Sequence, residues 1–132
     1  MAMSNYLEDL VLNGILRGQN FPTAENVYAG LFLTDPGEDG TTGTEVTGNG
    51  YARQATTFAA PVQTDGMATC TNDAEIDFGI ATGTWGNITH VALFDASTGG
   101  NMLYHMALAS PKLIEDGDNL RFFVGNLSVS QG

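Results

Sequence analysis

The strongest indication of the fold of this chain is the stretch WGNITHVALFDASTGGNMLYHMAL, residues 85–108. Two apolar runs flank Ser97-Thr98-Gly99-Gly100, and this composition predicts a β-hairpin with strands at about 87–95 and 101–109. A loop closed around those four residues gives the pairs Phe94–Leu103, Ala92–His105 and His90–Ala107. The hairpin therefore supplies the first strand pair of the fold and its register.

Both histidines of the chain lie on this hairpin. In the register above, His90 and His105 share one face and lie on a diagonal, about 7–8 Å apart at Cα, whereas a slip of one residue separates them. Two imidazoles offer two metal ligands, and no His, Asp or Glu stands at the neighbouring strand positions to offer a third. We therefore interpret both histidines as strand residues and predict no metal site and no cofactor.

Period-two patterns and turn signals continue on both sides of the hairpin. The expected strands are 27–33, which is apolar on both faces as in a central strand, 51–60, 67–80, and a long strand at 120–130 that bends at Gly125. The sequence thus predicts a mainly β fold, an antiparallel β-sandwich or partly closed barrel of six to seven strands over about 27–130. We expect one domain over residues 1–132, because no linker or repeat interrupts the chain.

One helix is expected before the first strand, at about residues 4–17. Ser4 or Asn5 can cap its start, and Gly18 stands where a C-terminal cap glycine belongs. Its apolar arc is wider than one domain face requires, and the residues that we assign to an assembly interface are Leu7, Val11, Leu12, Ile15 and Leu16. Two interpretations stay open: the helix is sunk in its own core, or it is shared with a neighbouring subunit.

The segment 34–50, TDPGEDGTTGTEVTGNG, predicts a long exposed loop because it is rich in Gly, Thr and acid. Its acidic side chains are Asp35, Glu38, Asp39 and Glu45. The loop begins like a calcium-binding loop, but Val46 stands at the twelfth position, where such a loop carries a bidentate glutamate. We predict an outward-facing or host-facing surface, and weak calcium binding stays open as an alternative.

Charge and composition exclude several classes of partner and activity. Fifteen Asp and Glu against four Lys and Arg give a formal net charge of −11, so we predict no nucleic-acid and no anionic-membrane partner. The single cysteine, Cys70, forms neither an internal disulfide nor a CxxC zinc motif. No GxSxG elbow is present, and the paired acids lie in turns or on exposed strand faces. These absences favour a protein that is not an enzyme.

Three ordered pieces of the sequence carry a resemblance to a known family. They are MSNYLEDLVLNGILRGQNFPTAENVYAGLFLTDP at the start, TGTEVTGNGYARQATTF after it, and WGNITHVALFDASTGGNMLYHMAL at the hairpin. In this order and spacing they resemble a family of small tailed-bacteriophage virion proteins usually described as phage tail fibre proteins. The resemblance covers roughly residues 3–129.

The resemblance implies a structural protein without catalytic residues. It implies a virion location after synthesis in the host bacterial cytoplasm, and docking on other virion proteins of the capsid or the tail. With the wide apolar helix it also implies a homo-oligomer. The chain would then be a tail-fibre-like or capsid-decoration subunit.

The alternative function is a carbohydrate-binding module, with or without the help of calcium, that recognises a host surface glycan. Sugars stack on flat aromatic rings, so exposure of Tyr51 or Trp85 near the acidic loop would favour this alternative. Burial of both rings would count against it.

Overall fold

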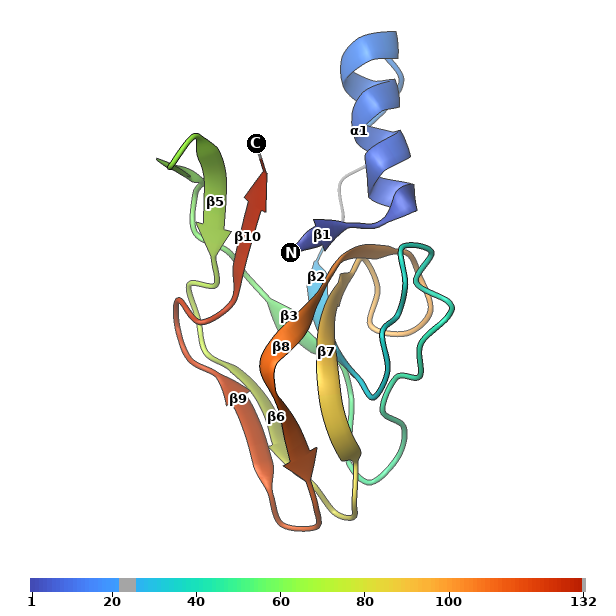
Figure 1. The fold of residues 1–132 in the computed structure, drawn as a ribbon, viewed down its shortest axis with the longest axis vertical. Coiled ribbons are helices and arrows are strands. Elements are labelled where there is room, and N and C mark those ends of the chain that lie inside the picture. Colours follow the sequence, from blue (N-terminus) through green and yellow to red (C-terminus); the bar gives the residue numbers. More distant parts are fainter. Residues whose placement is uncertain (22–25, 132) are drawn as a thin grey trace.

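The hairpin predicted from residues 85–108 lies in the largest sheet of the protein (Figure 1). In the computed structural model, β7 (Gly86–Phe94) pairs antiparallel with β8 (Met102–Ile114). The predicted pairs Ala92–His105 and His90–Ala107 are confirmed. Phe94 lies opposite Met102 and not opposite Leu103 as predicted, because the register shifts between Leu93 and Phe94 beside the turn.

The structure describes residues 1–21 and 26–131; residues 22–25 and 132 of the expected domain lie outside the described residues. The large sheet has five strands in the order β1-β8-β7-β2-β3. Its remaining strands are β1 (Ala2–Met3), β2 (Val27–Phe32) and β3 (Gln54–Thr56). The prediction of a central strand at 27–33 is confirmed, because β2 lies between β7 and β3 and is buried on both faces.

Two smaller antiparallel sheets complete the fold. They contain β4 (Val62–Thr64), β5 (Met67–Thr71) and β10 (Ser128–Gln131) in one sheet, and β6 (Ile76–Ile80) and β9 (Asn119–Phe122) in the other. The fold is mainly β and sandwich-like with one N-terminal helix, as predicted, and the sheets of the described residues close into no barrel. The described residues form ten strands and not the six or seven predicted, because two expected strands are each divided in two and because the short strands β1 and β4 were not predicted.

Both divisions occur at one buried side chain, Asn72. The expected strand 67–80 becomes β5 and β6, and the expected strand 120–130 becomes β9 and β10. Asn72 is fully buried, and its Nδ2 donates to the carbonyl oxygens of Ala74 and Phe123, both at 2.9 Å. Its Oδ1 accepts a hydrogen bond from the Leu127 amide at 2.9 Å. The amide therefore satisfies the backbone groups that the two bent strands leave unpaired.

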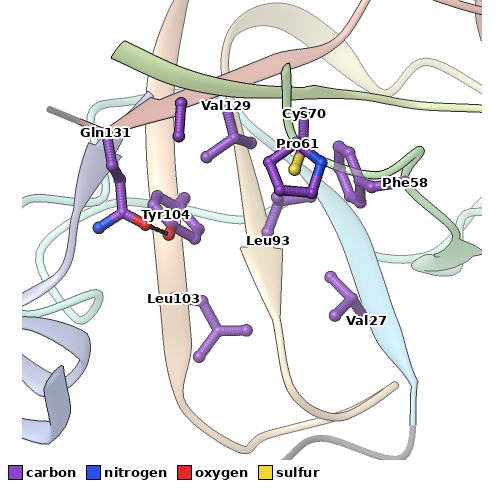
Figure 2. Close-up of a pocket in the computed structure, with 10 residues that line it drawn as sticks. Val27, Phe58, Pro61, Cys70, Leu93, Leu103, Tyr104, Val129 and Gln131 are labelled. Carbon is purple, nitrogen blue, oxygen red and sulfur yellow. Dashed lines mark hydrogen bonds between the residues drawn. The ribbon is translucent and has the colours of Figure 1, made fainter. Parts of the chain in front are cut away.

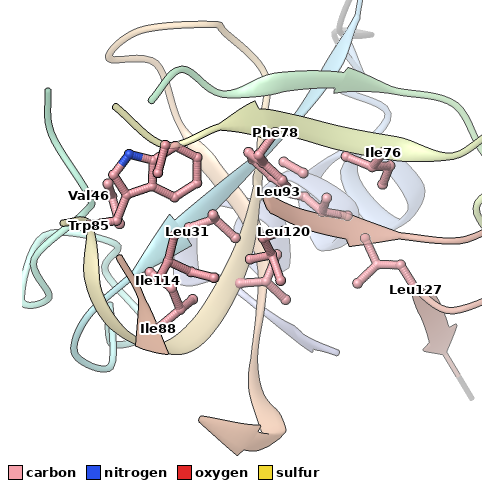
Figure 3. Packing of buried hydrophobic residues seen from close by; sticks show 13 residues of the cluster. Leu31, Val46, Ile76, Phe78, Trp85, Ile88, Leu93, Ile114, Leu120 and Leu127 are labelled. Atoms are coloured by element: carbon pink, nitrogen blue, oxygen red, sulfur yellow. The ribbon is translucent and has the colours of Figure 1, made fainter. Parts of the chain in front are cut away.

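The main core lies between the large sheet and the strands β6 and β9 (Figure 3). Its most buried large side chains are Leu31, Ile76, Ile88, Val91, Leu93 and Leu127. A smaller cluster of Phe32, Ala92, Phe94 and Met102 forms from the opposite faces of β2 and β7 with the start of β8. The sheet is therefore covered on both faces in its central strands.

The helix α1 (Asn5–Arg17) begins and ends as the sequence predicts. Ser4 is the N-cap, with its side-chain oxygen accepting from the Leu7 amide, and Gly18 ends the helix in the left-handed conformation at φ 66°. Figure 1 shows the helix projecting from one end of the β structure. The strands that it packs against are β1 and β8. The interpretation of a helix sunk in its own core is therefore wrong for its outer turns.

Asn72→Ala is expected to lower the free energy of unfolding by about 3 kcal/mol, because it leaves three buried backbone groups without a partner. Urea denaturation followed by Trp85 fluorescence measures this loss. Asn126→Ala is the matched control: its side chain is exposed, so the change should stay within about 0.5 kcal/mol. Equal stability of the two variants would contradict the role given to Asn72.

Candidate assembly surface and acidic loop

The outer turns of α1 expose three aliphatic side chains to water. Leu12 is 56 % exposed, and Ile15 and Leu16 are each 75 % exposed. Their spacing of three and four residues places them on one side of the helix, as a continuous stripe. We call Leu12, Ile15 and Leu16 the helix stripe. A single exposed leucine is ordinary, whereas three adjacent ones mark a surface that another molecule can cover.

The expected interface residues Leu7 and Val11 do not belong to this stripe. Leu7 is only 8 % exposed and Val11 is half-buried. They lie on the side of the helix that faces the β structure. The apolar arc is wide enough for this side to pack inward while the stripe stays exposed. The assignment of Leu7 to a contact with another subunit is therefore corrected, because its side chain is already buried within its own chain at the base of the helix.

Backbone and side-chain hydrogen bonds fix the base of α1. The Ser4 amide donates to the Leu103 carbonyl at 2.9 Å, and the Ser4 hydroxyl donates to the Met102 carbonyl. The Asn5 amide donates to the Glu38 carbonyl at 2.9 Å. The helix is thus held to β8 and to the acidic loop at the same point, which sets the direction in which the stripe projects.

Three of the four predicted loop acids are exposed. Asp35, Glu38 and Asp39 lie at the surface, as expected for an outward-facing loop. Asp35 accepts from the Gly37 amide at 2.9 Å, and Asp39 accepts from the Thr41 amide at 2.9 Å. The hydrogen bonds from Thr41 lower the pKa of the Asp39 carboxyl. These local bonds shape the loop without gathering the acids into one site.

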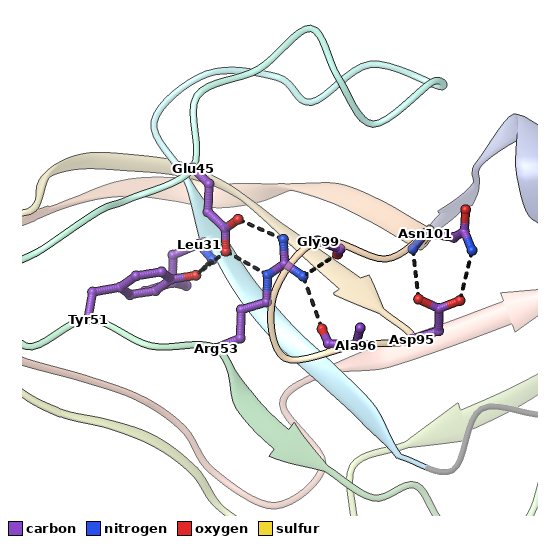
Figure 4. Close-up of polar contacts among 8 residues, drawn as sticks. All are labelled: Leu31, Glu45, Tyr51, Arg53, Asp95, Ala96, Gly99 and Asn101. Atoms are coloured by element: carbon purple, nitrogen blue, oxygen red, sulfur yellow. Dashed lines mark hydrogen bonds and ion pairs between the residues drawn. The ribbon is translucent and has the colours of Figure 1, made fainter.

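Glu45 is the exception, and its assignment to the exposed acidic surface is corrected. Its Oε1 lies 2.8 Å from Arg53 Nη2, and its Oε2 accepts from Arg53 Nε at 2.8 Å and from the Tyr51 hydroxyl at 2.6 Å (Figure 4). The side chains of Arg53 and Glu45 are only 9 % and 21 % exposed. Glu45 therefore forms a bidentate, largely buried ion pair.

The same guanidinium reaches the hairpin turn. Arg53 Nη1 donates to the carbonyl oxygens of Ala96 at 3.0 Å and Gly99 at 2.9 Å. The guanidinium also stacks on Phe94, with Cζ 3.5 Å from the ring centroid. Arg53 thereby joins the acidic loop, through Glu45, to the turn between β7 and β8.

Gly30 in β2 makes room for this network. A Cβ atom at Gly30 would lie 2.9 Å from Glu45 Oε2 and 3.3 Å from the Tyr51 hydroxyl. That hydroxyl accepts from the Leu31 amide at 2.9 Å. Burial, followed by the hydrogen bond to Glu45, raises the pKa of the Tyr51 phenol. The phenol therefore stays a hydrogen-bond donor over the whole neutral range.

The two histidines share one face of the hairpin, beside the acidic loop. His90 Nε2 and His105 Nδ1 each lie 3.9 Å from an oxygen of Asp35, and His105 Nε2 lies 3.6 Å from Glu38 Oε1. Within residues 1–21 and 26–131, no group of three or more His, Cys, Asp or Glu is arranged to hold a metal ion. The acidic neighbours come from the loop and not from the strands, so strand spacing alone did not point to them.

Neither aromatic residue considered for sugar stacking presents a free ring. Trp85 is 4 % exposed, and its Nε1 donates to the Asn49 carbonyl at 2.9 Å. Tyr51 is half-buried and packs edge-on against Trp85, with ring centroids 5.6 Å apart. Both observations count against a glycan platform built on these two rings.

The fold and these surfaces define a β-rich module whose most distinctive exposed feature is an apolar helix stripe. No helix in the described part of the chain has the length and apolar character needed to cross a membrane. The chain belongs to the family of the podophage GP4 fiber I protein gp80, whose family model matches residues 2–130. None of the curated proteins compared with the sequence matches it.

Family membership confirms the resemblance to phage tail fibre proteins over nearly the whole chain. It places the protein among phage fibre proteins, which supports a structural role in the tail fibre and association with the virion. A fibre family also suggests a structural protein and not an enzyme.

Glu45→Gln is expected to lower the free energy of unfolding by about 3 kcal/mol, because Arg53 keeps its buried charge and loses its counter-charge. Calorimetry of the two proteins measures the effect. Glu115→Gln, which changes an exposed acid, should change stability by no more than about 0.5 kcal/mol. If Glu45→Gln lowers the free energy of unfolding by less than about 1 kcal/mol, the ion pair contributes little to stability.

The raised pKa of Tyr51 predicts a loss of stability in alkali. Above about pH 10 the unfolded chain releases the phenol proton while the folded chain retains it, so stability falls by up to about 1.4 kcal/mol per pH unit. Tyr51→Phe removes this contribution, and its stability should fall less between pH 10 and 11, by the same rough amount. Urea titrations at both pH values measure the free energy of unfolding of the original protein and of Tyr51→Phe. An equal loss of this free energy from pH 10 to pH 11 in both proteins would contradict the prediction.

Proposed function

We propose that the protein is a non-enzymatic structural subunit of the phage tail fibre that self-associates and docks on other virion proteins. The family match over residues 2–130 is the observation that supports the fibre role. The exposed helix stripe supports self-association. In this proposal the β-sandwich is a rigid body, and α1 is the element that joins it to its neighbours.

Burial of the helix stripe supplies a driving force for assembly. Complete burial of a leucine or isoleucine side chain is worth about 1.5–3 kcal/mol, so covering three that are now more than half exposed gives roughly 3–6 kcal/mol. This is enough for a weak contact between two copies and becomes strong when several copies associate. The hydrogen bonds at Ser4 and Asn5 hold the helix in position for this contact.

The acidic loop supports an outward orientation. With a net charge of −11, copies of the chain repel each other, so a contact between them is favoured away from the exposed acids Asp35, Glu38 and Asp39. The loop then faces solvent or the host. A capsid-decoration subunit would use the same surfaces, and the location on the particle separates the two roles.

The double variant Leu12→Asp/Ile15→Asp is expected to shift the protein from an oligomer to a monomer, since it places two charges in the contact. Sedimentation velocity measures the mass, and the far-UV spectrum should keep its β character. Gln19→Asp/Asn20→Asp adds the same charge at exposed positions after the helix and should leave the oligomer intact. Oligomers of equal mass in both variants would contradict the assigned interface.

A further inference from the structure

An apolar groove lies between the large sheet and the sheet of β4, β5 and β10 (Figure 2). Val27, Leu93 and Leu103 line it from the large sheet, and Cys70, Val129 and Phe58 line it from the other side. Its volume of about 360 Å³ lies within the range of sites that bury ligand-sized groups, roughly 300–1,000 Å³. The groove therefore offers unfilled apolar space at the surface of the protein.

None of the described residues that line this groove is charged. Its polar groups are few, and the Tyr104 hydroxyl already donates to Gln131 Oε1 at 2.7 Å. A charged ligand or an acidic peptide would find no partner there. Because each chain carries a net charge of −11, a second copy is tolerated best where neither surface carries an acid. The groove meets this condition.

The three side chains of the helix stripe are uncharged as well, and the exposed carboxylate of Glu8 lies on the same side of α1 one turn nearer its base, outside the stripe itself. Leu12, Ile15 and Leu16 are uncharged aliphatic side chains at positions i, i+3 and i+4, the spacing with which a helix docks in an apolar groove. The groove and α1 also lie near each other on the molecule, because Leu103 and Tyr104 of β8 line the groove and α1 packs against β8. Each copy thus presents one apolar helix stripe and one uncharged apolar groove.

We propose that the helix stripe of one copy docks in the groove between the large sheet and β5–β10 of the next copy. This inference rests on the proposed self-association and specifies its geometry: the contact is head-to-tail, between two different surfaces. A contact of this kind leaves one helix and one groove free in every open assembly. It therefore closes into a ring or continues as a filament.

Cys70 provides a direct test, because it lines the groove and is the only cysteine of the chain. Leu16→Cys places a second thiol on the helix stripe, at a position that is 75 % exposed. A disulfide needs Cα atoms about 4.4–6.8 Å apart, so mild oxidation joins the two thiols only when the helix occupies a groove. The products are separated by size in denaturing, non-reducing gels.

The expected result for Leu16→Cys is a ladder of dimers, trimers and larger species, or one ring-sized species. The ladder should disappear when Cys70→Ser is added. Arg17→Cys is the matched control: Arg17 points away from the stripe toward Asn13, to whose Oδ1 its Nη1 donates at 3.0 Å. This variant should form few links or none.

Three results would overturn the inference. Dimers that persist with Cys70→Ser would show that two helices pair with each other, which leaves the proposed self-association standing and removes the groove. A disulfide within one chain would show that the helix occupies its own groove. A protein that forms no disulfide and sediments as a monomer would overturn the self-association together with the groove.

Discussion

The arrangement of the smaller sheets depends on the three hydrogen bonds of the Asn72 side chain. Two long antiparallel strands would otherwise continue as one ribbon, and an unpaired buried backbone group costs about as much as a lost hydrogen bond. Asn72 supplies partners for the groups at the bend, including Phe123 and Leu127, which lie 51 and 55 residues further along the chain. The ribbon is then divided between two sheets, and its outer part, β5 and β10, forms one wall of the apolar groove.

Much of this architecture could be predicted from local patterns. The hairpin turn, the helix from its Ser4 cap to Gly18, and the central strand β2 follow from turn chemistry, capping and hydrophobic period, which act over a few residues. The bend at Gly125 also follows from the sequence, and Gly125 lies between β9 and β10 with φ 83°. The break of the other strand at Asn72 could not be predicted in this way. In the sequence it is one more polar residue in a strand, and its partners come from a distant segment.

Glu45 is a second residue whose partners could not be predicted from local sequence patterns. It lies in a run of Gly, Thr and acid, and composition assigns it to the solvent-exposed loop. Its partner Arg53 is one of four basic residues in a chain with fifteen acids, and a lone cation so close to a loop of acids was the one available signal. The exposure of the helix stripe is also a property of the fold. The wide apolar arc was compatible with packing on the chain's own core and with contact to a neighbouring subunit, and only the structure shows which residues face inward.

The most direct test of the fibre role is to locate the protein on the virion. Gold-labelled antibody raised against this chain can be imaged on intact particles by electron microscopy. We expect label confined to the tail fibres, as membership of a phage fibre family supports. Label spread over the head would contradict it, and would make the protein a capsid-decoration subunit that uses the same helix for contacts on the shell.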